Sequence, residues 1–94
     1  MEFSTYILKC SDGSFYTGHT DNLELRIAQH HSGYFPDCYT FKKRPLELAY
    51  QAHFESREQA LAAEMQIKGW SRRKKIALIN NDFDALKNFS RKRT

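Results

Sequence analysis

The pattern of apolar and polar residues near the start of the chain predicts a β-hairpin. Residues 3–10 (Phe-Ser-Thr-Tyr-Ile-Leu-Lys-Cys) are rich in the aromatic and β-branched side chains that strands favour. Residues 11–14 (Ser-Asp-Gly-Ser) form a turn, because Asp and Gly tolerate the positive φ that a hairpin demands. Residues 15–20 return as a second strand, antiparallel to the first.

A helix follows the hairpin. Asp21, with Glu24 three residues later, is close to a capping box and marks the start of this helix. Gly33 marks its end, since glycine readily adopts the left-handed conformation that closes many helices. Residues 34–44 mix proline, aromatic and basic residues without a period, so we expect a loop there. The buried stripe of the helix would consist of Leu23, Ile27 and Ala28.

The middle of the chain predicts a third strand and a second helix. Residues 46–54 alternate apolar and polar positions, as a half-buried strand does. Ser56 and Gln59 form a second capping box, which opens a helix that extends to about Lys68. The inward-facing positions of the strand would be Leu46, Leu48, Tyr50, Ala52 and Phe54.

Gly69 interrupts the helical pattern, and Ser71 can cap a further helix that carries Ile76, Leu78 and Ile79. A last short helix would carry Phe83, Leu86 and Phe89. The order β-β-α-β-α-α favours an α+β fold in which helices pack on a small antiparallel sheet. We expect a single domain over residues 1–94, with its core at about 3–80 and a basic tail at about 90–94.

The composition narrows the class of protein. The chain has 94 residues, of which 40% are hydrophobic and 28% charged, which leaves no room for a second domain or a repeat array. Its apolar runs are no longer than four residues, far too short to span a membrane. We expect a cytoplasmic protein, because no signal-like segment opens the chain and Cys10 and Cys38 cannot build a disulfide framework.

The positive charge is clustered. The net charge is +4, and most of the fifteen basic residues fall in three groups that contain no acidic residue. Such clusters attract polyanions, above all nucleic acid, although they can also serve only as a solubilising surface and a basic tail. The three groups are Lys42-Lys43-Arg44; Lys68 with Arg72-Arg73-Lys74-Lys75; and Arg91-Lys92-Arg93.

Glu64 interrupts a stripe of apolar residues. On a helix with 3.6 residues per turn, Ala60, Glu64 and Ile67 lie on one line that should face the core. A buried carboxylate is costly unless a cation, a metal ion or hydrogen bonds compensate it. The simplest alternative is an ion pair with Lys68, four residues later.

Arg26 and His30 stand one turn apart at the border of the first helix's apolar face. Together an arginine and a histidine can grip a phosphate and move a proton, although single residues of these types are often plain surface.

Aromatic residues gather beside the first basic cluster, at Tyr34, Phe35, Tyr39 and Phe41. This mixture suits the stacking of single-stranded bases, but it could equally cover the core beneath a long loop. Trp70 follows Gly69 between two helices, where we expect it to act as a structural wedge.

The residues Ser4-Thr5-Tyr6 and Tyr16-Thr17-Gly18 resemble the two halves of the GIY-YIG nuclease signature. The resemblance continues through the helix of Arg26 and His30 and through residues 42–79, and so covers about residues 4 to 79. Ser4-Thr5 stands in place of Gly-Ile and Thr17 in place of Ile, and His19 and His31 occupy positions where the family often has aliphatic and asparagine residues.

The resemblance implies a metal-dependent endonuclease that hydrolyses phosphodiester bonds. Glu64 would hold Mg²⁺ or Mn²⁺, and Arg26 would stabilise the charge of the transition state. Tyr16 would be the general base, helped by Tyr6 or His30, and how the three share the proton is left open. Gly18 would let the backbone approach the helix or the phosphate closely.

The expected substrate is DNA, single-stranded or branched rather than plain duplex, with RNA as a further option and a protein partner that could supply specificity. Substrate phosphates would contact Lys42, Lys43, Arg44, Lys68, Arg72, Arg73, Lys74 and Lys75. The alternative function is a non-catalytic nucleic-acid-binding module with the same fold.

The length of the hairpin loop tests the two-tyrosine site. A two-residue loop at Asp12-Gly13 would pair Tyr16 with Lys9 and put Tyr6 and Tyr16 on opposite faces of the hairpin. A three-residue loop with a bulge shifts the register by one and brings both tyrosines to one face. We therefore expect an odd loop or a bulge.

Overall fold

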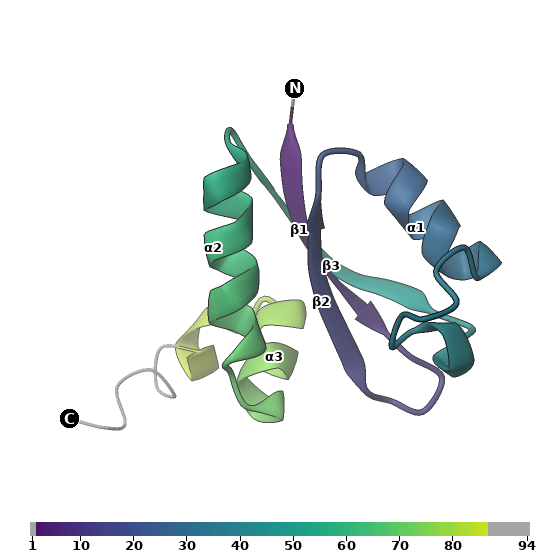
Figure 1. The fold of residues 1–94 in the computed structure, drawn as a ribbon. Helices are drawn as coiled ribbons and strands as arrows, with labels where there is room; N and C mark the ends of the chain where they lie inside the picture. The colour runs from purple at the N-terminus through teal and green to yellow at the C-terminus, as the bar shows by residue number, and fades with distance from the viewer. Residues whose placement is uncertain (1, 87–94) are drawn as a thin grey trace.

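The computed structural model describes residues 2–86, which form a three-stranded antiparallel sheet with helices packed on it (Figure 1). The strand order is β2-β1-β3, so β1 is central and β2 is an edge strand. This α+β architecture confirms the fold class expected from the sequence. Its elements are β1 (Phe3–Lys9), β2 (Phe15–Thr20), α1 (Leu23–Ser32), a short 3₁₀ helix (Phe41–Lys43), β3 (Glu47–Phe54), α2 (Arg57–Lys68) and α3 (Arg72–Ile79).

Successive residues of β1 face opposite sides of the sheet and form two cores. Tyr6 and Leu8 are buried with Cys10 and Leu46, and α1 packs on this side through Leu23 and Ile27. Ile7 is buried on the other side against Ile67 of α2 and Leu78 of α3. Helix α1 therefore covers one face and α2 and α3 cover the other, as Figure 1 shows.

The hairpin between β1 and β2 has the odd loop that the two-tyrosine site requires. The Cys10 amide donates to the Ser14 carbonyl (2.8 Å), so three residues close the turn, and Gly13 takes a positive φ of 88°. Tyr6 pairs with Gly18, and Leu8 pairs with Tyr16. Because partners in a ladder share a face, Tyr6 and Tyr16 lie on the same face, and the expectation is confirmed.

The helix caps agree with the sequence in two helices of three. Ser56 accepts from the Gln59 amide at the start of α2, and Ser71 accepts from the Lys74 amide at the start of α3. For α1 the expected cap was wrong by one residue. Asn22 caps this helix, because its side-chain oxygen accepts a hydrogen bond from the Leu25 amide (3.1 Å).

Several of the expected apolar positions are exposed, among them Ala28, Leu48 and Ile76. Ala28 of α1 is exposed, whereas His30 is the buried residue of that helix. In β3 the alternation fails at Leu48, which is 37% exposed. The cause is a bulge, since Ile7 pairs with Tyr50 while Leu8 pairs with Leu48, so the register slips between them.

Residues 83–86 are helical at the end of the described chain, and Leu86 packs against the α2–α3 core, as expected. Phe83 is 62% exposed, while Phe89 and the basic tail lie outside the described residues. None of the helices within residues 2–86 is long and apolar enough to cross a membrane.

Candidate active site

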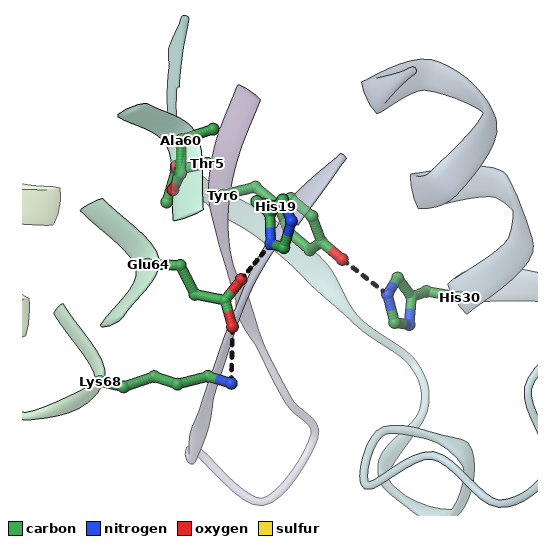
Figure 2. A network of polar contacts seen from close by, with 7 residues as sticks. All are labelled: Thr5, Tyr6, His19, His30, Ala60, Glu64 and Lys68. Carbon is green, nitrogen blue, oxygen red and sulfur yellow. Dashed lines mark hydrogen bonds and ion pairs between the residues drawn. The ribbon is translucent and has the colours of Figure 1, made fainter. Parts of the chain in front are cut away.

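The side chain of Tyr6 lies across the backbone of Gly18 in the neighbouring edge strand. A Cβ atom at position 18 would stand 2.6 Å from the Tyr6 hydroxyl oxygen, closer than real Cβ atoms approach. Position 18 must therefore lack a side chain so that the tyrosine can extend over β2 towards α1 (Figure 2). The close neighbour of Gly18 within the protein is thus the Tyr6 ring, whereas the sequence suggested a close approach to the helix or the phosphate.

Replacing Gly18 by alanine should displace the Tyr6 ring and destabilise the fold by about 1–3 kcal/mol, the usual cost of overpacking a core. Urea unfolding of the purified variant measures this loss. Gly69→Ala is the matched control, because a Cβ atom there would meet its nearest neighbour, the Gln66 carbonyl, at an ordinary 3.6 Å. Equal stability of the two variants would contradict the crossing of Tyr6 over Gly18.

A buried chain of hydrogen bonds begins at Tyr6. Its hydroxyl lies 3.0 Å from Nε2 of His30, and Nδ1 of His30 lies 3.0 Å from Oγ1 of Thr40 (Figure 2 shows the first bond). Burial, and then the charge of Arg26, lower the pKa of His30 below its usual value. His30 is therefore neutral at neutral pH and can accept a proton.

A cavity of about 390 Å³ opens beside this chain. Tyr16, Arg26 and His30 line it together with Phe35, and the Arg26 guanidinium lies 5.5 Å from the centre of the Phe35 ring. The centroid of the Tyr16 ring is 5.2 Å from that of His30. Burial, and then the neighbouring Tyr6, raise the pKa of Tyr16 well above its usual value. The Arg26 cation therefore lies beside the protonated phenol of Tyr16 and the neutral imidazole of His30, an arrangement suited to binding an anion.

Glu64 approaches the edge strand from the opposite side, on α2 (Figure 2). It is buried with Ala60 and Ile67, as the helical stripe predicts. Its carboxylate is compensated by two groups: Oε2 is paired with Lys68 Nζ (2.6 Å), and Oε1 with His19 Nδ1 (2.5 Å). The ion pair with Lys68 is thus present, and His19 adds a partner that the sequence marked only as an unusual residue.

Burial tends to raise the pKa of Glu64, but the hydrogen bonds from Lys68 and His19 outweigh burial and lower it. Glu64 is therefore ionised at neutral pH. Burial raises the pKa of Tyr6 and of Tyr16, and the charge of Glu64 adds a smaller contribution in the same direction. The five residues expected to form the site thus gather around one edge strand, with Glu64 on one side and the other four on the other.

The described residues contain no group of three or more His, Cys, Asp or Glu side chains that could enclose a metal ion. Such a cage is not needed for Mg²⁺, which proteins often hold by one carboxylate together with water and substrate phosphates. Glu64 is ionised and has the chemistry of that single ligand. It could bind the ion by exchanging its contact with Lys68 or His19.

Several of the basic residues expected to bind phosphates have partners within the protein. Lys43 pairs with Asp12 (2.5 Å), and this pairing lowers the pKa of the Asp12 carboxyl. Arg72 donates to the Gly13 carbonyl (2.7 Å) and so ties α3 to the hairpin. Three of these cations also lie over aromatic rings. The distances from the cation to the ring centroid are 4.6 Å for Arg44 over Phe41, 4.7 Å for Arg72 over Phe15 and 4.4 Å for Lys74 over Trp70.

Other basic residues lie beside the site. Lys68 and Lys75 border a depression of about 250 Å³ with Tyr16 and Tyr39. Lys42 is exposed, and Arg73 is an exposed residue of α3 that interacts with the rest of the protein.

Of the four aromatic residues in the loop, two pack against other side chains of the protein and two are exposed. Phe35 packs against His30 (5.4 Å between ring centroids), and Phe41 packs under Arg44. Tyr34 and Tyr39 are instead 64% and 51% exposed. Trp70 packs against the core between α2 and α3, at the position expected for a wedge.

Thr40 and Cys38 contribute to the site without having been identified in the sequence. Thr40 is buried and contacts His30, and Cys38 lines the cavity. Both lie in the segment expected to be an irregular loop. No periodicity marks them there, because their positions depend on how that loop folds back on α1.

The family model of the GIY-YIG catalytic domain matches residues 2–77. A UPF0213 protein of Staphylococcus saprophyticus is 45% identical over 75 residues, which are 80% of this chain and 90% of that protein. Two solution NMR structures are also similar. A UPF0213 protein of Bacillus halodurans is 41% identical, with a TM-score of 0.56, and the match covers 85% of this chain and 84% of that one. A protein of E. faecalis is 32% identical, with a TM-score of 0.60 and 88% of both chains covered. By this match, which spans most of the chain, the protein belongs to the GIY-YIG family of nuclease catalytic domains.

Proposed function

We propose that this protein is a metal-dependent endonuclease that hydrolyses phosphodiester bonds of nucleic acid, with DNA as its substrate. The observation that carries the proposal is the gathering of Tyr6, Tyr16, Arg26, His30 and Glu64 around the edge strand β2. Three of these residues line an open cavity large enough for a phosphate and part of its sugar. Membership of a nuclease family supports the same reaction.

Arg26 binds the scissile phosphate in this proposal. It lies in the cavity beside a neutral His30, so Arg26, and not His30, supplies the positive charge there. The charge on the phosphoryl oxygens increases in the transition state, and a fixed guanidinium stabilises it most at that point. A divalent ion, Mg²⁺ or Mn²⁺, held by Glu64 would polarise a phosphoryl oxygen.

Tyr16 contacts the attacking water and, once it has released its own hydroxyl proton to solvent, would accept a proton from that water. It lines the cavity, whereas Tyr6 has no exposed surface and cannot touch a water molecule there. Because the pKa of Tyr16 is raised in the free protein, the phenolate needs the nearby charge of Arg26. Tyr6 and His30 support the wall of the cavity from behind through their hydrogen bond.

The exposed tyrosines favour a substrate with unstacked bases. Tyr34 lines the cavity, and the Tyr39 ring lies nearly parallel to that of Tyr16, with 6.4 Å between centroids. Aromatic rings of this kind stack on the bases of single strands or branch points, which favours these forms of DNA over plain duplex, and RNA offers the same faces. Lys42, Lys68 and Lys75 would contact the backbone phosphates, and a protein partner could add sequence specificity.

A cytoplasmic location is part of this proposal; Cys10 and Cys38 are free thiols, the usual form of cysteine in that compartment.

The purified protein should cut end-labelled DNA in the presence of Mg²⁺ or Mn²⁺ and leave it intact in EDTA. Single-stranded, forked and duplex oligonucleotides of the same sequence are compared on denaturing gels, with the forked and single-stranded forms expected to be cut faster. A native gel run in parallel reports binding. If the DNA stays intact with every metal while the native gel shows a shifted band, the protein is a non-catalytic nucleic-acid-binding module and the proposed nuclease function is wrong.

A further inference from the structure

Thr40 connects the segment after α1 to the centre of the site. It is 1% exposed, and its hydroxyl oxygen lies 3.0 Å from Nδ1 of His30 and 3.4 Å from Sγ of Cys38. His30 is itself 3% exposed, and its other nitrogen meets the Tyr6 hydroxyl at 3.0 Å. Both ring nitrogens of His30 therefore have buried partners.

The donors and acceptors of this chain determine its direction. The Tyr6 hydroxyl is fully buried and has Nε2 of His30 as its hydrogen-bond partner. When Tyr6 donates its single hydrogen to Nε2 of His30, this nitrogen carries no proton. A neutral imidazole with a bare Nε2 has its hydrogen on Nδ1, where the Thr40 oxygen accepts it.

The hydroxyl hydrogen of Thr40 completes the chain by pointing at Cys38 Sγ. In this direction every hydrogen from Tyr6 to Thr40 has an acceptor. In the reverse direction the hydroxyl hydrogen of Tyr6 would have no acceptor among the described residues. Tyr6 has no exposed surface, so such an unpaired hydrogen would carry the full cost of desolvation.

We propose that Thr40 is a positioning residue of this site, which holds His30 in the tautomer with hydrogen on Nδ1 so that Nε2 accepts the hydroxyl hydrogen of Tyr6. His30, which lines the cavity, is then fixed in its orientation by both of its ring nitrogens. The effect of Thr40 on cleavage rests on the proposed nuclease function, whereas the tautomer of His30 does not.

The tautomer is read directly from the side-chain nitrogen resonances of His30 in ¹⁵N-labelled protein at neutral pH. The wild type should show a protonated Nδ1 and an unprotonated Nε2. Thr40→Ser keeps the hydroxyl and should give the same pattern, whereas Thr40→Val has nearly the same shape and removes the acceptor, so the protonated nitrogen should change. A wild type with hydrogen on Nε2 would overturn the proposal whether or not the valine variant folds, as would an unchanged tautomer in a folded Thr40→Val.

Cleavage of single-stranded DNA in Mg²⁺ measures the consequence for the reaction. Thr40→Val should be slower by about tenfold to hundredfold, the range seen when an outer hydrogen bond that orients a functional histidine is lost. Thr40→Ser should stay near the wild-type rate. Thr17→Val is the matched control, because Thr17 is also buried and its hydroxyl has no partner among the described residues.

Equal losses in Thr17→Val and Thr40→Val would assign the effect to packing and overturn the positioning role. A wild type that cuts no DNA, while His30 shows the expected tautomer and Thr40→Val changes it, would refute the proposed function and leave the tautomer assignment intact.

Discussion

Replacing Glu64 by glutamine should lower the rate of metal-dependent DNA cleavage by about a thousandfold. The substitution keeps the shape of the side chain and removes the charge that would hold a divalent ion, whose contribution to phosphoryl transfer amounts to several kcal/mol. Lys68 and His19 would remain in place beside a neutral amide. The loss should appear equally in Mg²⁺ and in Mn²⁺ and should not be recovered by raising the metal concentration.

The measurement compares initial cleavage rates of Glu64→Gln and Glu58→Gln, an exposed carboxylate on the same helix. Affinity for the same DNA in EDTA should be unchanged or higher in Glu64→Gln, since the variant has one negative charge fewer. Because the Lys68 partner of the lost ion pair is 51% exposed, the folding free energy should change by only about 1 kcal/mol. Wild-type cleavage by a folded Glu64→Gln would show that the metal is not bound there.

The position of Glu64 could be predicted because a helix repeats its geometry from residue to residue. Once residues 57–68 are recognised as a helix, the spacing alone places Ala60, Glu64 and Ile67 on one buried line. What compensates the carboxylate could not be chosen from the spacing. Lys68 lies on the same helix, but His19 comes from the edge strand, and its contact depends on how α2 packs on the sheet.

That Tyr6 and Tyr16 share a face of the sheet could also be predicted from local geometry, because the number of residues in the hairpin loop determines the register of the two strands. The bulge in β3 and the Asn22 cap of α1 were missed, because neighbouring residues offered equally good choices and tertiary packing selected between them. The contact of Thr40 with His30 could not be predicted, because no sequence pattern marks a single threonine within an irregular loop. Sequence reasoning thus found the residues whose chemistry is conspicuous and missed Thr40, which we propose to orient His30.

Removing the side chain of Arg26 should lower the cleavage rate by about a hundredfold to a thousandfold, the usual cost of losing one fixed group that stabilises transition-state charge. The guanidinium would have two tasks in this site. It would bind the phosphate within the cavity, and its charge acts on the buried Tyr6 hydroxyl. Arg26→Ala loses both, and the space between Tyr16 and Phe35 fills with water, which weakens the remaining electrostatic interactions.

The Arg26→Lys variant tests whether positive charge alone is sufficient for these two tasks. Lysine keeps the positive charge but lacks the planar fork, so the rate should fall less than in the alanine variant without returning to the wild-type value. Affinity for DNA in EDTA should decrease by about tenfold or less in either variant, since one contact of this kind is worth about 1.4 kcal/mol. Arg57→Ala, which removes an exposed arginine paired with Asp21, provides the control for net charge and should cut at nearly the wild-type rate. A loss confined to affinity, with the rate at saturating DNA unchanged, would make Arg26 a substrate-binding residue and leave the charge of the transition state to other groups.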